Sequence, residues 1–463
     1  MLFTPRRTVA VNYQFHPNIL IKEVGMKRKI TVLVMAGFWI AAVGLFACGR
    51  EQAVDVREVM AQPKEFVGSD TCRNCHLEHY DSWKSTLHSR MLIDVRENPY
   101  AILADMNPDL IRADLENVKD RLKVPVEDVY IPTKDEILYT IGTQWKQRYI
   151  VQKDGTYHVA PVQYNIATKR WVNYYDDAWD KRDWLVRCGG CHATGVDLDN
   201  YTFAETSIGC EACHGPGSQH TALPRTALFE KRETIINPAK LTAGVAVQIC
   251  GSCHTRGNAK HETYPEAGWP VGFTPGMVME PIYESSYDKA DMRRLYPDYA
   301  SRSHHQQYID WMQSEHAVQG VTCTSCHSVH RLGISPTRFQ TKEAGSSQCL
   351  SCHTMVNANR AHSIHSFANC LGCHMPRIAS TAEPNDIRSH TFNARAPMDT
   401  IDDPNLPNSC QICHYHKDDD LAELQRKYEI LTQLPQPQGM MIPAVTYDTF
   451  TERPGTAPVA SPE

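Results

Sequence analysis

The sequence predicts a mainly α-helical chain with much irregular structure and one small antiparallel β insertion. Two observations lead to this fold class. The motif C-x-x-C-H occurs eight times between residues 72 and 414 of a 463-residue chain that holds 17 cysteines and 22 histidines. Residues 128–175, between the first two copies, contain strand-like segments and a hairpin signal at Asp154-Gly155.

The repeated motif decides between three chemistries of paired cysteines. Zinc sites of four thiolates and redox dithiols need only the two cysteines. A histidine nevertheless follows the second cysteine in all eight copies. Covalent attachment of a c-type haem uses all three residues, because the two thiols bind the haem vinyl groups and the histidine binds the iron. We therefore predict eight covalently attached c-type haems.

The predicted attachment residues follow directly from the eight motifs. The haem-binding cysteines are Cys72, Cys75, Cys188, Cys191, Cys210, Cys213, Cys250, Cys253, Cys323, Cys326, Cys349, Cys352, Cys370, Cys373, Cys410 and Cys413. The iron-binding histidines of the motifs are His76, His192, His214, His254, His327, His353, His374 and His414.

A chain that packs around haems needs little regular structure, because the apolar haem faces replace much of the side-chain core. We expect a multihaem cytochrome c fold over residues 68–431, with a short helix at each motif and long irregular links. Helices are also expected over 299–318 and 418–434. The Pro-rich tail 432–463 is predicted to be disordered.

Histidines outside the motifs supply candidates for the second axial ligand of each iron. An iron with two protein ligands transfers electrons but leaves no place for a substrate. The predicted distal ligands are His88, His220, His305, His316, His330, His362, His365 and His390. We expect His305 and His316 on one face of one helix, since they are three turns apart. Methionine is the rival ligand type. Five further histidines are not predicted to be distal ligands: His79, His158, His261, His304 and His416.

Residues 1–47 have the pattern of an export leader. Lys27, Arg28 and Lys29 precede an uncharged apolar run, so Met26 is the expected true start. The run ends in a lipobox-like sequence before Cys48, which predicts a lipidated cysteine and a tether over 48–67. An uncleaved membrane anchor is the alternative. Both place the protein outside the cytoplasm and tied to a membrane. The lipobox predicts a lipoprotein in the periplasm or on the outer membrane, with the cell surface as a further location.

The charge balance excludes nucleic acid as an expected partner. Removing residues 1–47 takes six basic residues from 47 and one acidic residue from 53, which leaves 41 against 52 and a net charge of −11. An acidic surface favours basic or metal-bearing partners.

Several segments carry a family resemblance. VGSDTCRNCHLEHYDSWKSTLHSR, CGGCHATG, IGCEACHGPGSQH, GVTCTSCHSVH and CLGCHMP resemble the multihaem cytochromes that include the tetrahaem cytochrome of ammonia oxidisers, octahaem hydroxylamine oxidoreductase and pentahaem nitrite reductase. The likeness covers most of residues 68–416. It implies closely stacked haem pairs on a mostly helical frame, and it supports the predicted distal ligands, His362 least directly.

The sequence departs from that family's enzymes in two ways. Nitrite- and tetrathionate-reducing relatives carry a lysine ligand at the active haem, whereas all eight motifs here end in histidine. No motif marks a cross-linking tyrosine of the kind that hydroxylamine oxidoreductase carries.

The resulting prediction is an electron carrier rather than an enzyme. A membrane-tethered octahaem cytochrome would carry electrons in anaerobic or extracellular respiration, from a periplasmic or quinol-linked donor to metal oxides or another cytochrome. Its expected partners are quinol-linked membrane cytochromes and components of a porin–cytochrome conduit, with a haem filament as a third possibility. Every iron is then expected to be low-spin and six-coordinate.

The alternative prediction is a reductase or dehydrogenase of a small nitrogen or sulfur compound, such as nitrite, hydroxylamine, sulfite or tetrathionate. It requires one haem that is open on its distal side. The motif of His254 is the candidate for this site, with Arg256, His261 and Tyr264 nearby in the sequence.

Overall fold

The computed structural model describes residues 54–330, 339–357, 359–365, 368–413, 415–433 and 440–444. The predicted leader, Cys48 and His414 lie outside these ranges. The described residues from Val56 onward belong to one compact unit. No helix in these ranges is long and apolar enough to cross a membrane.

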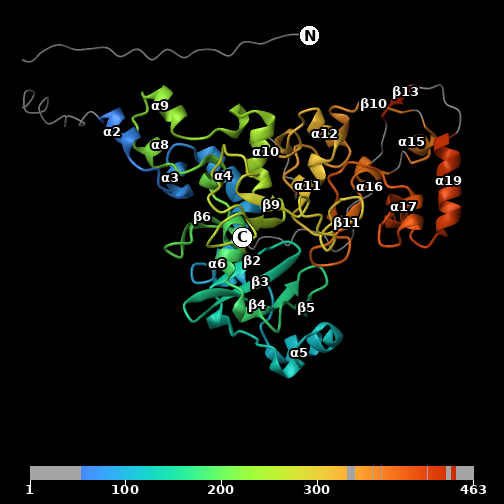
Figure 1. The fold of residues 1–463 in the computed structure, drawn as a ribbon, viewed down its shortest axis with the longest axis horizontal. Helices are drawn as coiled ribbons and strands as arrows, with labels where there is room; N and C mark the ends of the chain where they lie inside the picture. The colour runs from blue at the N-terminus through green and yellow to red at the C-terminus, as the bar shows by residue number, and fades with distance from the viewer. Residues whose placement is uncertain are drawn as a thin grey trace, which may run out of the picture. The chain divides into compact units, whose positions relative to one another are not determined.

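Short helices mark all eight motifs, as the sequence predicts. Each motif starts on a helix of its own, and the chain between these helices is largely irregular (Figure 1). In chain order the helices are α3 (Ser69–Arg73), α6 (Trp184–His192), α7 (Cys210–His214), α10 (Ala243–Gly251), α13 (Cys323–Cys326), α14 (Ser347–Leu350), α16 (Cys370–His374) and α18 (Ser409–Ile412).

The other helices are also short. They are α2 (Val56–Ala61), α4 (Leu77–Lys84), α5 (Pro108–Glu116), α8 (Ser218–Ala222), α9 (Leu228–Glu233), α11 (Gln307–Met312), α12 (Glu315–Val318), α15 (Arg360–Ile364), α17 (Pro397–Asp402) and α19 (Leu421–Gln433). The helix predicted over 418–434 is confirmed as α19.

The largest sheet is an antiparallel meander in the order β1-β2-β3-β4-β5. Its strands are β1 (Leu92–Asp94), β2 (Tyr139–Ile141), β3 (Lys146–Lys153), β4 (Thr156–Asn165) and β5 (Arg170–Asn173). The last four fall within 128–175, while β1 comes from further upstream. Asp154 and Gly155 form the β3–β4 turn with φ of 50° and 83°, which the predicted hairpin requires.

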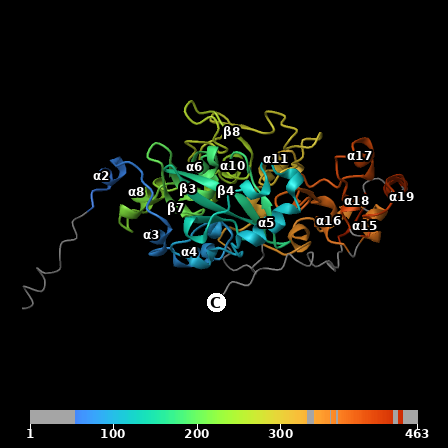
Figure 2. The ribbon, with the colours of Figure 1, turned by 90° about the horizontal axis from the view of Figure 1, so that it is seen from below.

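This sheet positions the second motif. Alternate residues of a strand point to opposite faces. On one face Tyr149 packs with Ile111 and Leu115 of α5, which lies against the sheet (Figure 2). On the other face Ile150 packs with Trp184 and Leu185 of α6. Helix α6 and its C-x-x-C-H motif are therefore fixed against the sheet by a hydrophobic core.

Four two-stranded antiparallel sheets complete the described strands. They pair β6 (Ala193–Asp197) with β7 (Thr202–Thr206), β8 (Gly257–Ala259) with β9 (Tyr283–Ser285), β10 (Met355–Asn357) with β13 (Met441–Pro443), and β11 (Arg377–Ala379) with β12 (Ile387–Arg388). Strand β13 corrects the prediction of a wholly disordered tail over 432–463. Its apolar residues find a partner strand that the local composition does not reveal.

The predicted helix over 299–318 is wrong. Two short helices, α11 and α12, replace it, and His305 precedes both with a positive φ of 48°. A non-glycine residue with positive φ cannot continue a right-handed helix. His305 and His316 therefore do not share one helix face.

Candidate haem centres

Six motif histidines each face a second histidine ring. In four pairs the ring planes are inclined by 12–25° and the centres are 6.1–6.4 Å apart: His76–His220, His214–His330, His327–His390 and His374–His362. In two pairs the planes are nearly perpendicular, with centres 6.4 and 5.9 Å apart: His254–His88 and His353–His316.

This spacing fits a haem iron between the two rings. A metal–imidazole bond of about 2 Å, added to about 1 Å from the nitrogen to the ring centre, gives about 6 Å for two rings on opposite sides of a metal. Axial histidines bind haem iron from opposite faces. The six pairs therefore have the geometry of proximal and distal haem ligands.

Backbone carbonyl groups hold many of these rings in the tautomer that a metal needs. The Nδ1 atoms of His214, His220 and His362 lie 2.7, 2.9 and 2.8 Å from carbonyl oxygens. A carbonyl only accepts, so Nδ1 carries the proton and Nε2 is left with its lone pair. This is the usual support for a metal-binding imidazole.

The motifs lie close together in a defined order. In the described part of the chain, none of the sixteen motif cysteines is in a disulfide, which thioether formation requires. Thiols of different motifs approach each other in the pairs Cys72–Cys210, Cys191–Cys253, Cys250–Cys323 and Cys349–Cys370, and electrostatic contacts add Cys213–Cys253, Cys326–Cys352 and Cys373–Cys413. Motifs one, three, four, five, six, seven and eight thus form a row, and motif two branches from motif four.

The second motif differs from the six with paired rings. Asp183 caps helix α6 by accepting hydrogen bonds from the backbone N–H groups of Leu185 and Val186. At the other end, His192 faces no histidine ring at ligand spacing among the described residues, and its buried Nδ1 has no hydrogen-bond partner there. Burial lowers the pKa of His192 to about 4, so the imidazole is neutral and able to bind a metal.

Among the described residues, the His305 ring does not face a motif histidine at the spacing of an axial ligand. Its ring makes a T-shaped contact with His304, with the centres 4.5 Å apart. It remains an electrostatic neighbour of both His192 and His254. Because His88 faces His254 with ring centres 6.4 Å apart, the geometry does not favour the open haem that the sequence suggested at His254.

Three basic side chains lie near one another beside the second motif, and we call Lys146, Arg148 and Arg256 the inner cation cluster. The guanidinium of Arg148 lies 3.7 Å from the centre of the Tyr174 ring. Nε of Arg256 donates to the His304 carbonyl at 3.1 Å. Burial is the main reason that the pKa of Lys146 falls to about 6 and that of Arg256 to about 10.

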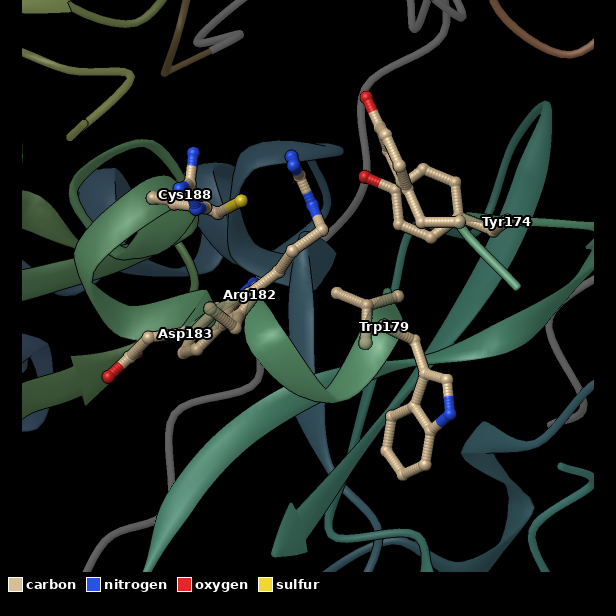
Figure 3. A pocket seen from close by; sticks show the side chains of 9 residues that line it. Tyr174, Trp179, Arg182, Asp183 and Cys188 are labelled. Carbon is tan, nitrogen blue, oxygen red and sulfur yellow. The ribbon is translucent and has the colours of Figure 1, made fainter. Parts of the chain in front are cut away.

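A small pocket beside Cys188 adds two further cations, Arg182 and Arg187. Figure 3 shows the Cys188 sulfur pointing toward the side chain of Arg182, with Tyr174 across the pocket and the Asp183 carboxylate pointing away. Cations here can bind the propionates of a haem, a small anionic ligand, or both. The alternating Lys146 and Arg148 of a largely interior strand are the signal in the sequence that could have revealed the cluster.

The eighth motif is only partly described. His365 has its Nδ1 2.9 Å from the Ala361 carbonyl oxygen, and its ring centre lies 6.3 Å from that of His416. The motif histidine, His414, lies outside the described residues. The structure therefore leaves the assignment of His365 as a prediction.

Glycine at position 190 inside the second motif has a steric reason. A Cβ there would lie 2.2 Å from the ring of Trp269. The Trp269 indole N–H is fixed by a hydrogen bond of 2.8 Å to the Val186 carbonyl, so the ring cannot easily withdraw. Close packing against Trp269 thus sets the shape of this motif.

We expect Gly190→Ala to destabilise the protein by about 2 kcal/mol, or to prevent haem attachment at this motif, because overpacking displaces α6 or Trp269. The measurements are the haem-to-protein ratio and the thermal unfolding midpoint. The matched control is Gly372→Ala, at the same position of the seventh motif, where the added methyl group meets only Asn369 Oδ1 at 3.5 Å. Equal behaviour of the two variants would contradict the steric explanation.

Two sequence families match parts of the chain. "Cytochrome c554 and c-prime" matches residues 155–215, and "Doubled CXXCH motif" matches residues 316–358. Each match includes two of the C-x-x-C-H motifs.

Curated relatives match a limited part of the chain. The cytochrome c nitrite reductase subunit NrfA of Nitratidesulfovibrio vulgaris is 25% identical over 171 residues, which are 31% of this chain and 31% of the relative. Cytochrome c-552 of Bacteroides fragilis is 28% identical over 141 residues, 27% of this chain and 26% of the relative. The chain thus spans under a third of either relative's length.

One solved structure shows a similar fold over a larger part of the chain. The outer cell wall cytochrome OcwA superposes with a TM-score of 0.61 at 21% identity, over 79% of this chain and 86% of OcwA. The undecaheme cytochrome from the S-layer of Carboxydothermus ferrireducens gives a TM-score of 0.41 at 18% identity, over 79% and 60% of the two chains. With its repeated motifs and its partial matches to cytochrome families and to a curated cytochrome, the chain is a multihaem c-type cytochrome whose haems are attached covalently through C-x-x-C-H motifs.

Proposed function

We propose that this protein is an octahaem electron carrier. The observation that carries the proposal is the row of motifs in which six histidines face a second histidine at the spacing of axial ligands. Two imidazole ligands leave an iron suited to electron exchange and not to substrate binding. The contacts between thiols of successive motifs support a row in which neighbouring haems would be close enough for electrons to pass between them.

The cellular setting of this carrier is part of the proposal. The leader-like residues 1–47 and the lipobox before Cys48 support export and a lipid tether. The fold similarity to an outer cell wall cytochrome is compatible with that setting. The donor would be a quinol-linked or periplasmic cytochrome, and the acceptor a metal oxide, another cytochrome or a porin–cytochrome conduit.

Reoxidation of the fully reduced holoprotein tests the carrier function. Mixing with ferric citrate should oxidise the haems completely in stopped-flow absorption, because each haem in the row exchanges electrons with its neighbours. A large fraction of haems that stay reduced would contradict a continuous row.

A second candidate function, redox catalysis at the haem of Cys188 and Cys191, is favoured by His192. It faces no second histidine among the described residues, and the inner cation cluster lies beside it. The haem would supply an iron that binds a small substrate and receives electrons from the row. Arg148 and Arg256 would bind and orient an anionic substrate and stabilise its charge, and Lys146, whose pKa of about 6 leaves it mostly neutral at pH 7, would donate a hydrogen bond.

The substrates to test are nitrite, hydroxylamine, sulfite and tetrathionate. Oxidation of a reduced viologen dye by the holoprotein measures turnover of each of them. Catalysis predicts steady oxidation of the dye with at least one substrate, whereas a carrier without catalysis oxidises only the amount of dye that reduces its own haems once.

A further inference from the structure

A polar cavity of about 520 Å³ lies on the surface of the described unit, apart from the haem motifs. Its lining combines two arginines with hydroxyl and amide groups and contains no carboxylate. The lining residues are Arg293, Tyr296, Arg302, Ser303, Ser380, Pro384, Asn385, Pro404, Asn405 and Pro407.

Arg302 is the cation of this cavity that is available to a ligand. Its side chain is exposed, and its guanidinium lies 5.8 Å from the centre of the Tyr296 ring. In the part of the chain that the structure describes, no carboxylate pairs with it. Arg293 is engaged with Asp291, Nε to Oδ1 at 2.9 Å. The cavity therefore presents an unpaired guanidinium beside hydrogen-bonding groups.

The cavity shares a thin wall with the inner cation cluster. Two segments cross here: the His304 N–H donates to the Ser380 carbonyl, and the Ser380 N–H donates to the Arg302 carbonyl, both at 3.1 Å. Ser303 and Ser380 line the cavity. His304 and Thr381, which follow Ser303 and Ser380, accept hydrogen bonds from the interior side. Arg256 donates to the His304 carbonyl, and Lys146 donates to the Thr381 carbonyl at 2.7 Å.

Arginine side chains also lie on both sides of this wall. Arg294, adjacent to Arg293 of the lining, is an electrostatic neighbour of Arg256, and Arg256 in turn neighbours Arg148. Arg148 is the charge that acts on His192. Arg294, Arg256 and Arg148 thus lead from the surface cavity to the second motif, and they outnumber the carboxylates beside them, Asp291 at Arg294 and Asp386 near Lys146. An excess of positive charge concentrates anionic ligands.

We propose that the cavity is a binding site for small oxyanions and their entry to the haem of Cys188 and Cys191. The proposal rests on the second candidate function, in which that haem is open to a ligand. A guanidinium binds oxyanions through paired hydrogen bonds. The Ser303 hydroxyl and the Asn385 amide supply further donors, and the volume accommodates a small hydrated oxyanion.

The experiment compares an anionic and a neutral ligand of the open ferric haem. Stopped-flow absorption measures the association and dissociation rates of nitrite and of imidazole with the full-length oxidised holoprotein. The test variant is Arg302→Gln. The matched control is Arg121→Gln, another exposed arginine, which lies outside the cavity lining.

In Arg302→Gln we expect the association rate of nitrite to fall about fivefold at low ionic strength, with less effect at high salt. The dissociation rate of nitrite and both rates of imidazole should stay unchanged, and Arg121→Gln should match the wild type. Unchanged nitrite association, or equal slowing of both ligands, overturns the entry site and leaves the open haem intact. Failure of the wild type to bind either ligand instead overturns the open haem itself, and the entry proposal with it.

Discussion

Replacing both Cys188 and Cys191 by alanine is expected to abolish cyanide uptake by the oxidised protein. His192 is the motif histidine that faces no second histidine among the described residues, so its haem is the one expected to be high-spin and open. Loss of this haem removes the open iron and lowers the intact mass by one haem. The measurements are mass spectrometry, the high-spin paramagnetic resonance signal and a cyanide titration.

The matched control is the double replacement of Cys349 and Cys352 by alanine. His353 in that motif faces His316 with ring centres 5.9 Å apart. This variant should also lose one haem, yet it should keep the high-spin signal and take up about one cyanide per molecule. Cyanide uptake that survives in the Cys188 and Cys191 variant would show that the open iron lies at another motif.

The second large effect is expected from His390→Ala, which should open a second haem. The His390 ring faces His327 at 6.4 Å with an inclination of 24°, and its backbone N–H is anchored by Asp310 Oδ2 at 2.8 Å. Removing the ring leaves the iron bound by His327 with one protein ligand. The high-spin signal should about double, and cyanide uptake should rise from about one to about two per molecule.

His261→Ala is the control for this variant. The His261 ring stacks on Tyr264 with the centres 5.2 Å apart and faces no motif histidine in the described part of the chain. Its replacement should leave the spin state and the cyanide stoichiometry unchanged. If His390→Ala behaves like His261→Ala, His390 is not an axial ligand.

Local patterns predicted the elements that depend on neighbouring residues. The β3–β4 hairpin follows from Asp154 and Gly155, whose positive φ values suit the tight turn. Helix α19 follows from its amphipathic pattern. The prediction of a helix over 299–318 was wrong because it assumed one continuous helix. His305 adopts a positive φ, which ends any right-handed helix before α11.

Ligand pairing shows the limit of reasoning from sequence. His220 lies six residues after His214 of the third motif in the sequence. Its ring nevertheless faces His76 of the first motif. His88 likewise comes from the first motif's region and faces His254 of the fourth. Both histidines could be listed as candidates from the sequence, but their partners depend on how distant segments pack.

The sequence by itself determined the covalent chemistry of this protein, because two thiols and an imidazole within five residues are enough to attach a haem and bind its iron from one side. The tertiary structure decided which motif histidines face a second histidine ring, since that ring comes from a segment brought across the fold. It also placed Lys146, Arg148 and Arg256 beside His192, and it thereby distinguished one haem from the others.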